Sequence, residues 1–213
     1  MTRVGLRTPE RLNGIGAASY CGFSQDWYAD EWRQRAGCGP TTATVLLAYC
    51  LGRDGDWPVI RTTDEARRYM DRLWEYVTPS YGGLYKTRWM AEGLRRYLAA
   101  EGIARYTVEM LAVSILPSHR PTPQEVIAFI RDGLAADSPV AFLNRHAGRE
   151  AELDTWHWVP IVELLTAGET VTAVCVDEGR RKSFRPAAWL DDTLLGGGFV
   201  YLRPTADRQD VTG

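Results

Sequence analysis

A cysteine stands at the start of an apolar, helix-forming segment. Gly37 precedes Cys38, Gly39 and Pro40 follow it, and an apolar run covers residues 41–49. The positive end of a helix dipole favours the ionised thiol, and the thiolate is the nucleophile. Gly37 lets a substrate approach the backbone, and Pro40 fits a first helical turn, where its missing N–H costs little. These residues predict a nucleophile at Cys38, with Gly37 in its substrate-binding cleft.

The other three cysteines differ from Cys38 in their surroundings. Cys50 lies on the same expected helix, spaced from its apolar neighbours as one buried face. Cys175 lies inside the strand-like run 171–176. Both are predicted to be core residues, the usual role of a cysteine. Cys21 adjoins a glycine in a loop-like segment and remains a rival nucleophile.

A histidine and an aspartate at the ends of two strand-like runs can complete a cysteine site. His157 lies between two tryptophans at the start of one run, and Asp177 ends the next. A hairpin turn at residues 167–169 would place these two ends side by side. Asp177 would then orient the imidazole, whose other nitrogen takes the proton of Cys38. The alternative is an interior histidine and an unrelated turn residue.

Three further polar side chains are weighed for supporting roles. Gln34 lies four residues before Cys38, and its amide can donate an N–H toward a developing oxyanion. His146 lies in a loop-like segment and is an alternative base to His157. His119 lies between prolines and is expected to be solvated.

A glycine-rich aromatic loop at residues 78–85 supplies candidates for the substrate cleft. Tyr81, Gly82 and Gly83 belong to this loop, and Trp158 follows the candidate base. Glycines allow close approach of a ligand to the backbone, and aromatic rings offer contact area. Aromatic residues at such positions are as often plain packing, so both interpretations stay open.

The motif Gln-x-x-x-Cys-Gly-Pro at a helix start, followed by a histidine on a strand and a strand ending in aspartate, resembles the papain-like cysteine peptidases. Within them, the chain is most similar to the bacteriocin-processing peptidases that remove double-glycine leaders, loosely over residues 25–202. The resemblance implies a papain-like α+β fold, with the nucleophile helix packed on a C-terminal antiparallel sheet. It also implies a Cys38–His157–Asp177 triad, with Gln34 and the Cys38 backbone N–H forming the oxyanion hole.

Two features depart from that family. The transporter region that leader peptidases usually carry is not recognised here, so an export role does not transfer. The helical insert over residues 53–102 and the aromatic residues Trp27, Tyr28 and Trp32 indicate a substrate pocket particular to this chain.

Composition excludes several other functions. The 25 basic and 27 acidic residues leave a net charge of −2 without a long run of either sign, which gives no support to nucleic-acid binding. The three histidines are scattered and the four cysteines lack paired spacing, so neither a metal nor another cofactor is expected. We find neither the apolar core of a signal peptide nor a stretch approaching a membrane span. We therefore expect no membrane contact, a cytoplasmic location and reduced thiols.

The elements that must position these residues are helical first and strand-like later. Helices are expected at residues 38–51, 63–77, 87–100 and 122–134, and strands at 105–113, 139–143, 156–165, 170–177 and 198–202. This segregation is typical of the α+β class. One domain over residues 1–213 is expected, with a helical lobe at about 38–102, a sheet lobe at about 105–203 and a frayed tail from 204. Residues 1–30 are expected to be irregular, with turns at Asn13-Gly14 and Cys21-Gly22. The basic cluster at 180–182 is expected to be a solvated turn.

These residues together predict a thiol-dependent hydrolase that cleaves a peptide or a small amide through a Cys38 thioester. An acyltransferase that passes the same thioester to an amine acceptor would use the same groups, because the difference lies in the acceptor pocket. A non-catalytic binding module on the same scaffold is the third possibility.

Overall fold

The computed structural model describes residues 1–12, 21–56 and 60–205. The α-helices are α1 (Glu31–Ala36), α2 (Cys38–Arg53), α3 (Thr63–Trp74), α4 (Thr87–Ala100), α5 (Pro123–Ala135) and α6 (Pro186–Asp192). The strands are β1 (Thr2–Gly5), β2 (Tyr106–Val113), β3 (Val140–Asn144), β4 (His157–Ala167), β5 (Thr170–Asp177), β6 (Arg180–Phe184) and β7 (Gly197–Pro204). Three 3-10 helices are η1 (Pro9–Leu12), η2 (Gln25–Trp27) and η3 (Pro117–His119). The turn expected at Asn13-Gly14 and the tail after residue 205 lie outside the described residues.

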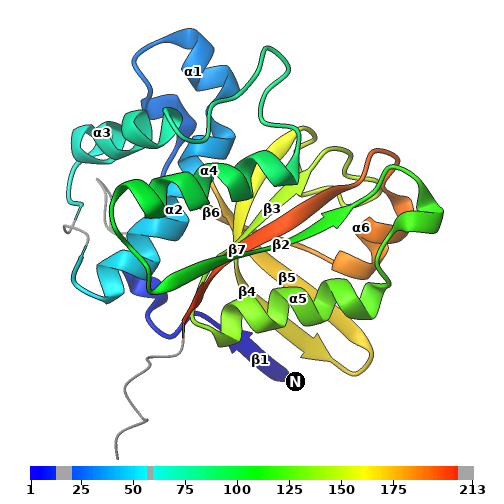
Figure 1. Cartoon of the computed structure of the whole chain (residues 1–213). Coiled ribbons are helices and arrows are strands. Elements are labelled where there is room, and N and C mark those ends of the chain that lie inside the picture. The colour runs from blue at the N-terminus through cyan, green and yellow to red at the C-terminus, as the bar shows by residue number, and fades with distance from the viewer. Residues whose placement is uncertain (13–20, 57–59, 206–213) are drawn as a thin grey trace, which may run out of the picture.

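The strands form one antiparallel sheet in the order β2-β7-β3-β4-β5-β6, and β1 pairs with the later part of β4. Strand β7 therefore lies between β2 and β3, far from its neighbours in sequence (Figure 1). The register places Asn144, at the end of β3, opposite His157, at the start of β4. The sheet thus brings three strand ends (β3, β4 and β5) to one edge.

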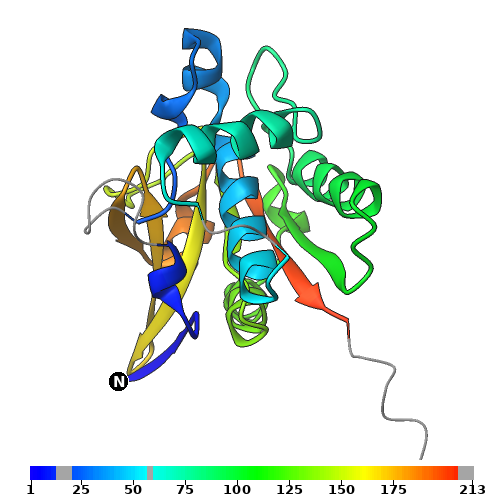
Figure 2. The same cartoon turned by 90° about the vertical axis from the view of Figure 1, so that its left-hand side faces the viewer.

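Helices cover both faces of the sheet (Figures 1 and 2). On one face, α2 packs on β4 and α4 packs on β2 and β7. On the other face, aromatic side chains of α5 and α6 pack on Phe142 and Phe199 of the sheet. The mixed helical and antiparallel architecture confirms the expected α+β class. Within the described ranges, no helix is long and apolar enough to cross a membrane.

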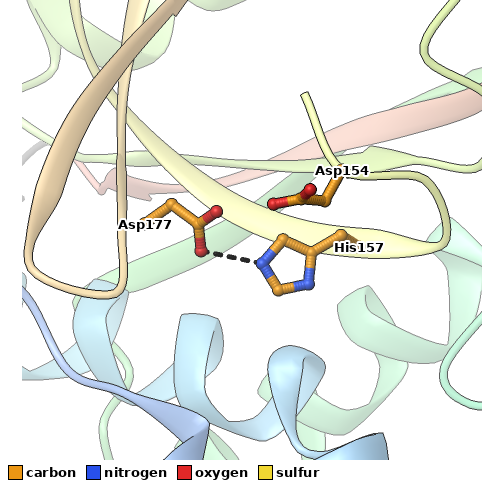
Figure 3. A group of neighbouring side chains, drawn as sticks. All are labelled: Asp154, His157 and Asp177. Atoms are coloured by element: carbon orange, nitrogen blue, oxygen red, sulfur yellow. Dashed lines mark hydrogen bonds and ion pairs between the residues drawn. The ribbon is translucent and has the colours of Figure 1, made fainter. Parts of the chain in front are cut away.

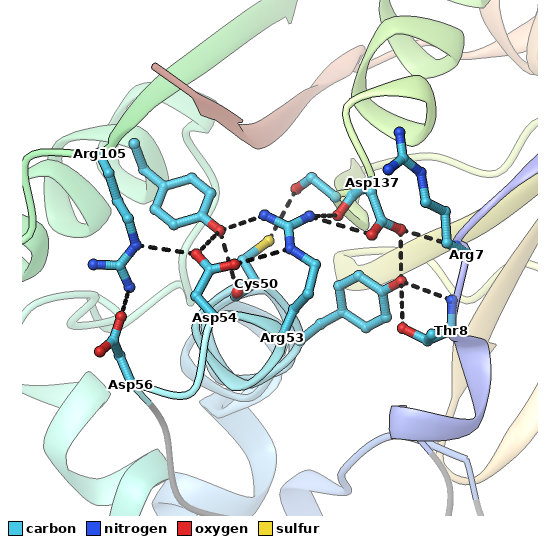
Figure 4. A network of polar contacts seen from close by, with 11 residues as sticks. Arg7, Thr8, Cys50, Arg53, Asp54, Asp56, Arg105 and Asp137 are labelled. Carbon is cyan, nitrogen blue, oxygen red and sulfur yellow. Dashed lines mark hydrogen bonds and ion pairs between the residues drawn. The ribbon is translucent and has the colours of Figure 1, made fainter. Parts of the chain in front are cut away.

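Helix α2 is fixed to the rest of the fold at both ends. Near its N-terminus, the hydroxyl of Thr42 donates to the backbone oxygen of Trp158 on β4 over 3.0 Å. At its C-terminus, the Arg53 guanidinium donates to the backbone oxygen of Asp137 at 3.0 Å and to the Tyr106 hydroxyl at 2.6 Å (Figure 4). The partners at the two ends are β4 on one side and β2 and the residue Asp137, which follows α5, on the other. The first residue of the helix therefore has a fixed position relative to β4.

Two helices begin close to the expected residues, each with a capping box. Thr62 caps α3 and Thr122 caps α5, and each hydroxyl accepts from the backbone N–H three residues later. Glu65 and Glu125 complete the two capping boxes by accepting from the cap residue in return. Local side-chain chemistry sets both boundaries.

Several elements differ from the sequence expectation. Residues 1–30 are not uniformly irregular, because β1 pairs with β4 and η2 adopts a 3-10 turn. The basic cluster at 180–182 is not a turn but the first part of β6, paired with β5. Helices α1 and α6 were not predicted, because each is shorter than the window over which helical periodicity shows.

Candidate active site

Cys38 is the first residue of α2 and is buried, with 7 % of its surface exposed. The glycines around it are required by close packing. A side chain at position 37 would clash with the backbone oxygen of Arg33 and the ring of Tyr28. A Cβ at position 39 would lie 2.6 Å from the Leu84 side chain. Glycine on either side of the thiol is therefore explained by neighbouring elements.

The hairpin of β4 and β5 places His157 beside Asp177. Gly168 turns the chain with a positive φ of 60° between the two strands. His157 Nε2 and Asp177 Oδ1 are 2.8 Å apart, and both side chains are largely buried. The aspartate therefore fixes the orientation of the imidazole and leaves Nδ1 for another partner.

Burial and charge act in opposite directions on this pair. Burial opposes protonation of His157, but the hydrogen bond to Asp177 and the interaction with Cys38 outweigh it and raise its pKa to about 10. Burial alone would raise the pKa of Asp177, yet the hydrogen bond and charge of His157, together with Lys182, lower it to about 2. At neutral pH the arrangement favours an imidazolium paired with a carboxylate.

A lysine from β6 holds the second oxygen of the aspartate. Lys182 Nζ donates to Asp177 Oδ2 at 2.7 Å and to Asp154 Oδ2 at 2.8 Å. Figure 3 shows Nε2 of His157 turned to Asp177, with the carboxylate of Asp154 close to the imidazole ring. Ligand atoms of these three residues lie within 4.8 Å of one another, a spacing compatible with a metal ion. Because the ammonium of Lys182 already bridges both carboxylates, the cluster is better described as an ion-pair network.

Asn144 fixes the chain on the other side of His157. Its Oδ1 accepts from the indole N–H of Trp189 at 2.9 Å, and its Nδ2 donates to the backbone oxygen of Asp154 at 2.8 Å. The segment leading into β4 is thus tied to β3 and α6. Sequence analysis missed both Asn144 and Lys182, because their roles depend on which strands become neighbours.

One pocket brings the three candidate catalytic side chains together. Cys38 from α2, His157 from β4 and Asp177 from β5 all line it. Trp158 also lines it, and its indole N–H donates to the backbone oxygen of Leu84 at 2.6 Å. Helix and sheet therefore meet at the thiol, with the imidazole between thiol and carboxylate.

Gln34 does not line this pocket in the described structure. Its Nε2 donates instead to the backbone oxygens of Tyr28 at 2.8 Å and Asp26 at 3.3 Å. Gln25, on η2, lines the pocket, and its Oε1 is buried without a hydrogen-bond partner among the described residues. Gln34 thus ties down the segment that carries Gln25. The separation of Gln25 and Cys38 in the sequence does not indicate that Gln25 lines the Cys38 pocket.

The other residues predicted for the substrate cleft lie elsewhere. Tyr81 is almost fully exposed and stacks on Trp32, with ring centroids 6.1 Å apart. Gly82 and Gly83 form a tight turn in which backbone groups of Ser80 and Gly83 bond to each other. None of these loop residues lines the Cys38 pocket as described, nor does Gly37.

The alternative nucleophile and base occupy different surroundings. Cys21 is buried, which raises the pKa of its thiol. Burial also raises the pKa values of Cys50 and Cys175 to about 12, and both are core residues as predicted. His146 Nδ1 accepts from the backbone N–H groups of Gly148 and Leu194 at 3.2 Å, so it organises a loop.

Comparison with known proteins reaches the fold but not the activity. No family model matches the chain, and no curated protein matches it. Among solved structures, UfSP from C. elegans is similar, with a TM-score of 0.54 and 11 % identity. The similarity covers 96 % of this chain and 35 % of that one, so the chain spans about a third of its length. This structural similarity supports the expected papain-like α+β fold, but it does not support the narrower bacteriocin-processing branch.

Proposed function

We propose that this protein is a thiol-dependent hydrolase that cleaves a peptide or small-amide bond. The observation that carries the proposal is the meeting of Cys38, His157 and Asp177 at one pocket, from three separate elements. The 2.8 Å bond from imidazole to carboxylate and the raised pKa of His157 support an activated thiol. The papain-like fold is compatible with this chemistry but does not by itself assign it.

The residues have distinct roles in the proposed reaction. The Cys38 thiolate attacks the amide carbonyl, and the protonated His157 gives its proton to the leaving amine as the thioester forms. His157 then takes a proton from water, which hydrolyses the thioester and frees Cys38. Asp177 holds the imidazole and balances its charge throughout.

The developing oxyanion needs hydrogen-bond donors. The backbone N–H of Cys38 lies at the N-terminus of α2, where the helix dipole favours negative charge. Gln25 is the proposed side-chain donor, in place of Gln34, because a rotation of its terminal amide brings Nε2 to the buried position now held by Oε1. Loss of one such donor is typically worth about 3 kcal/mol of transition-state stabilisation.

The test is alkylation of the native protein by iodoacetamide between pH 5 and 9, with each cysteine quantified by mass spectrometry. Cys50 and Cys175 serve as internal controls, because burial raises their pKa values to about 12. The proposal predicts rapid labelling at Cys38 that persists below pH 7 and slows in His157→Ala. Labelling that rises only above pH 8, or that falls on Cys21, would contradict it.

Turnover completes the test. Peptides released from a proteome digest should be cleaved by the wild type and left intact by Cys38→Ala. In Gln25→Ala the Cys38 alkylation rate should stay near that of the wild type, while turnover falls about 100-fold. Gln34→Ala probes the positioning contact, because it frees η2 without removing the proposed donor.

A further inference from the structure

Arg145 and Trp156 flank the pair of residues at which β3 and β4 meet the site. Asn144 ends β3 opposite His157, so Arg145 follows one member of the pair and Trp156 precedes the other. Consecutive Cα atoms are about 3.8 Å apart, which places Trp156 next to the candidate base and Arg145 next to Asn144, the strand partner of that base. The guanidinium carbon of Arg145 lies 5.0 Å from the centroid of the Trp156 ring, so the two side chains form one unit.

Trp156 has features of a binding surface rather than of packing. Its side chain is large and apolar, yet 51 % of the residue is exposed. Its φ of 56° lies in the left-handed region, where a bulky residue is strained. Such strain persists only where the surrounding structure imposes it, and it concentrates at ligand sites.

Arg145 carries a charge that no described carboxylate balances. No ion pair of Arg145 is found within residues 1–12, 21–56 and 60–205, and its buried Nε has no hydrogen-bond partner there. Arg149, in the same loop, is different because it pairs with Asp192 through two nitrogens. The carboxylates beside His157 are already bridged by Lys182. A guanidinium without an anionic partner is matched in shape and charge to a carboxylate ligand.

We propose that Arg145 and Trp156 form a subsite for a carboxylate carried by the leaving portion of the substrate. The inference rests on the proposed hydrolase function and narrows its substrate class. In the proposed reaction His157 protonates the leaving amine, and Arg145 and Trp156 lie at the same ends of β3 and β4 as His157, so we place the leaving portion of the substrate beside them. The preferred substrates are peptides in which an acidic side chain or a free C-terminal carboxylate follows the cleaved bond.

Binding is tested without turnover in the Cys38→Ala protein, by following the indole N–H signal of Trp156 in NMR spectra. The signal is assigned from its loss in Trp156→Phe. Three dipeptide probes are titrated: Glu-Ala-amide with a side-chain carboxylate, Ala-Ala with a C-terminal carboxylate, and the neutral Gln-Ala-amide. One or both carboxylate probes should shift the signal at concentrations where the neutral probe does not. Which of them acts tells the two carboxylate sources apart.

Matched variants separate the subsite from general charge effects. Arg145→Gln should abolish the shift, whereas Arg149→Gln, which loses an already paired arginine of the same loop, should retain it. Raising the salt concentration should weaken the shift, because the pair is partly exposed. Equal shifts with Glu-Ala-amide, Ala-Ala and Gln-Ala-amide, or a carboxylate response that survives Arg145→Gln, would overturn the proposal.

Turnover distinguishes the failure of this inference from failure of the proposed function. Peptides with Glu after the cleaved bond should have a kcat/KM about tenfold above that of their Gln counterparts, and Arg145→Gln should remove the difference. Cleavage by Cys38 without any preference for a carboxylate would refute the subsite alone. A carboxylate-specific shift in a protein without thiol-dependent turnover would refute the hydrolase and leave the binding site.

Discussion

The imidazole of His157 is held in its charged form by its neighbours. Burial works against that charge, but Asp177 and Cys38 outweigh it and raise the pKa to about 10. The imidazolium therefore persists through the whole neutral range. Cys38, the proposed nucleophile, therefore lies beside a positively charged partner.

Removing the charge of Asp177 should lower the pKa of His157. In Asp177→Asn, the pKa of His157 is expected to fall from about 10 toward the ordinary value of about 6.5, because its carboxylate partner is lost. Titration of the His157 ring protons by NMR measures the change. Asp154→Asn is the matched control, because Asp154 contacts Lys182 rather than the imidazole. An unchanged titration in Asp177→Asn would show that Asp177 does not control the base.

Sequence reasoning at the level of single residues succeeded where the partners were local. His157 and Asp177 could be paired because one short turn determines which strand ends meet. Gln25 could not be found, because its position depends on the contact between η2 and α1 that Gln34 maintains. The spacing of Gln34 from Cys38 likewise does not reveal that its amide donates to the backbone oxygens of Tyr28 and Asp26.

At the scale of elements, β6 shows how a charged segment can be misinterpreted. The run 180–182 has the composition of a solvated turn, yet in a strand its side chains alternate between faces. Lys182 consequently reaches Asp177 while its neighbours point elsewhere. Only the pairing of β6 with β5 creates this contact, and composition does not encode that pairing.

Lys182→Met should destabilise Asp177, because it removes the ammonium that β6 supplies to this carboxylate. The buried Asp177 loses an ammonium partner, and because Lys182 is partly exposed we expect the free energy of unfolding to fall by about 1–2 kcal/mol. The pKa of Asp177 should rise above about 2, so acid unfolding should begin at higher pH. Urea unfolding between pH 3 and 7 measures both, with the exposed Arg180→Met as control. Identical curves for the two variants would contradict a positioning role for Lys182.

The junction of α1 and α2 gives a second element-scale prediction. Gly37→Ala should lower the free energy of unfolding by about 1–3 kcal/mol, because its Cβ meets the Arg33 backbone oxygen and the Tyr28 ring. The clash also displaces Cys38, so alkylation by iodoacetamide should slow. Gly52→Ala, near the C-terminus of α2 and with no atom within 4 Å of the added Cβ, should be neutral or stabilising by up to about 1 kcal/mol. An unchanged free energy of unfolding in Gly37→Ala would contradict this prediction, because it would show that the Arg33 backbone and the Tyr28 ring can move aside at little cost.

At the scale of the whole molecule, the site couples stability to pH. The raised pKa of His157 contributes stability that is fully present below about 6.5 and is lost as the pH rises through about 10. Each unit of raised pKa corresponds to about 1.36 kcal/mol. The stability difference between wild type and His157→Gln should therefore shrink steadily from pH 6 to pH 10 in urea unfolding. A difference independent of pH would show that His157 is not charged in the folded protein.

The general architecture was predictable, because helical and strand-like periodicities are separated along the chain. The α+β class and the main helices follow from that separation. The order of strands does not, since β7 enters between β2 and β3 and β1 joins β4. Such pairing between strands distant in sequence depends on all the strands together. A short stretch of sequence therefore does not reveal which strands become neighbours.

The late position of β7 also affects how the protein matures on the ribosome. Cys38, His157 and Asp177 are all synthesised before the strand that separates β2 from β3. Until β7 emerges, β2 and β3 each lack a neighbour, and the β3 end that supports His157 has no strand on its outer side. A nascent chain therefore contains every reactive group before it has a finished sheet to hold them. The sheet that supports the site is therefore complete only after β7 has been synthesised.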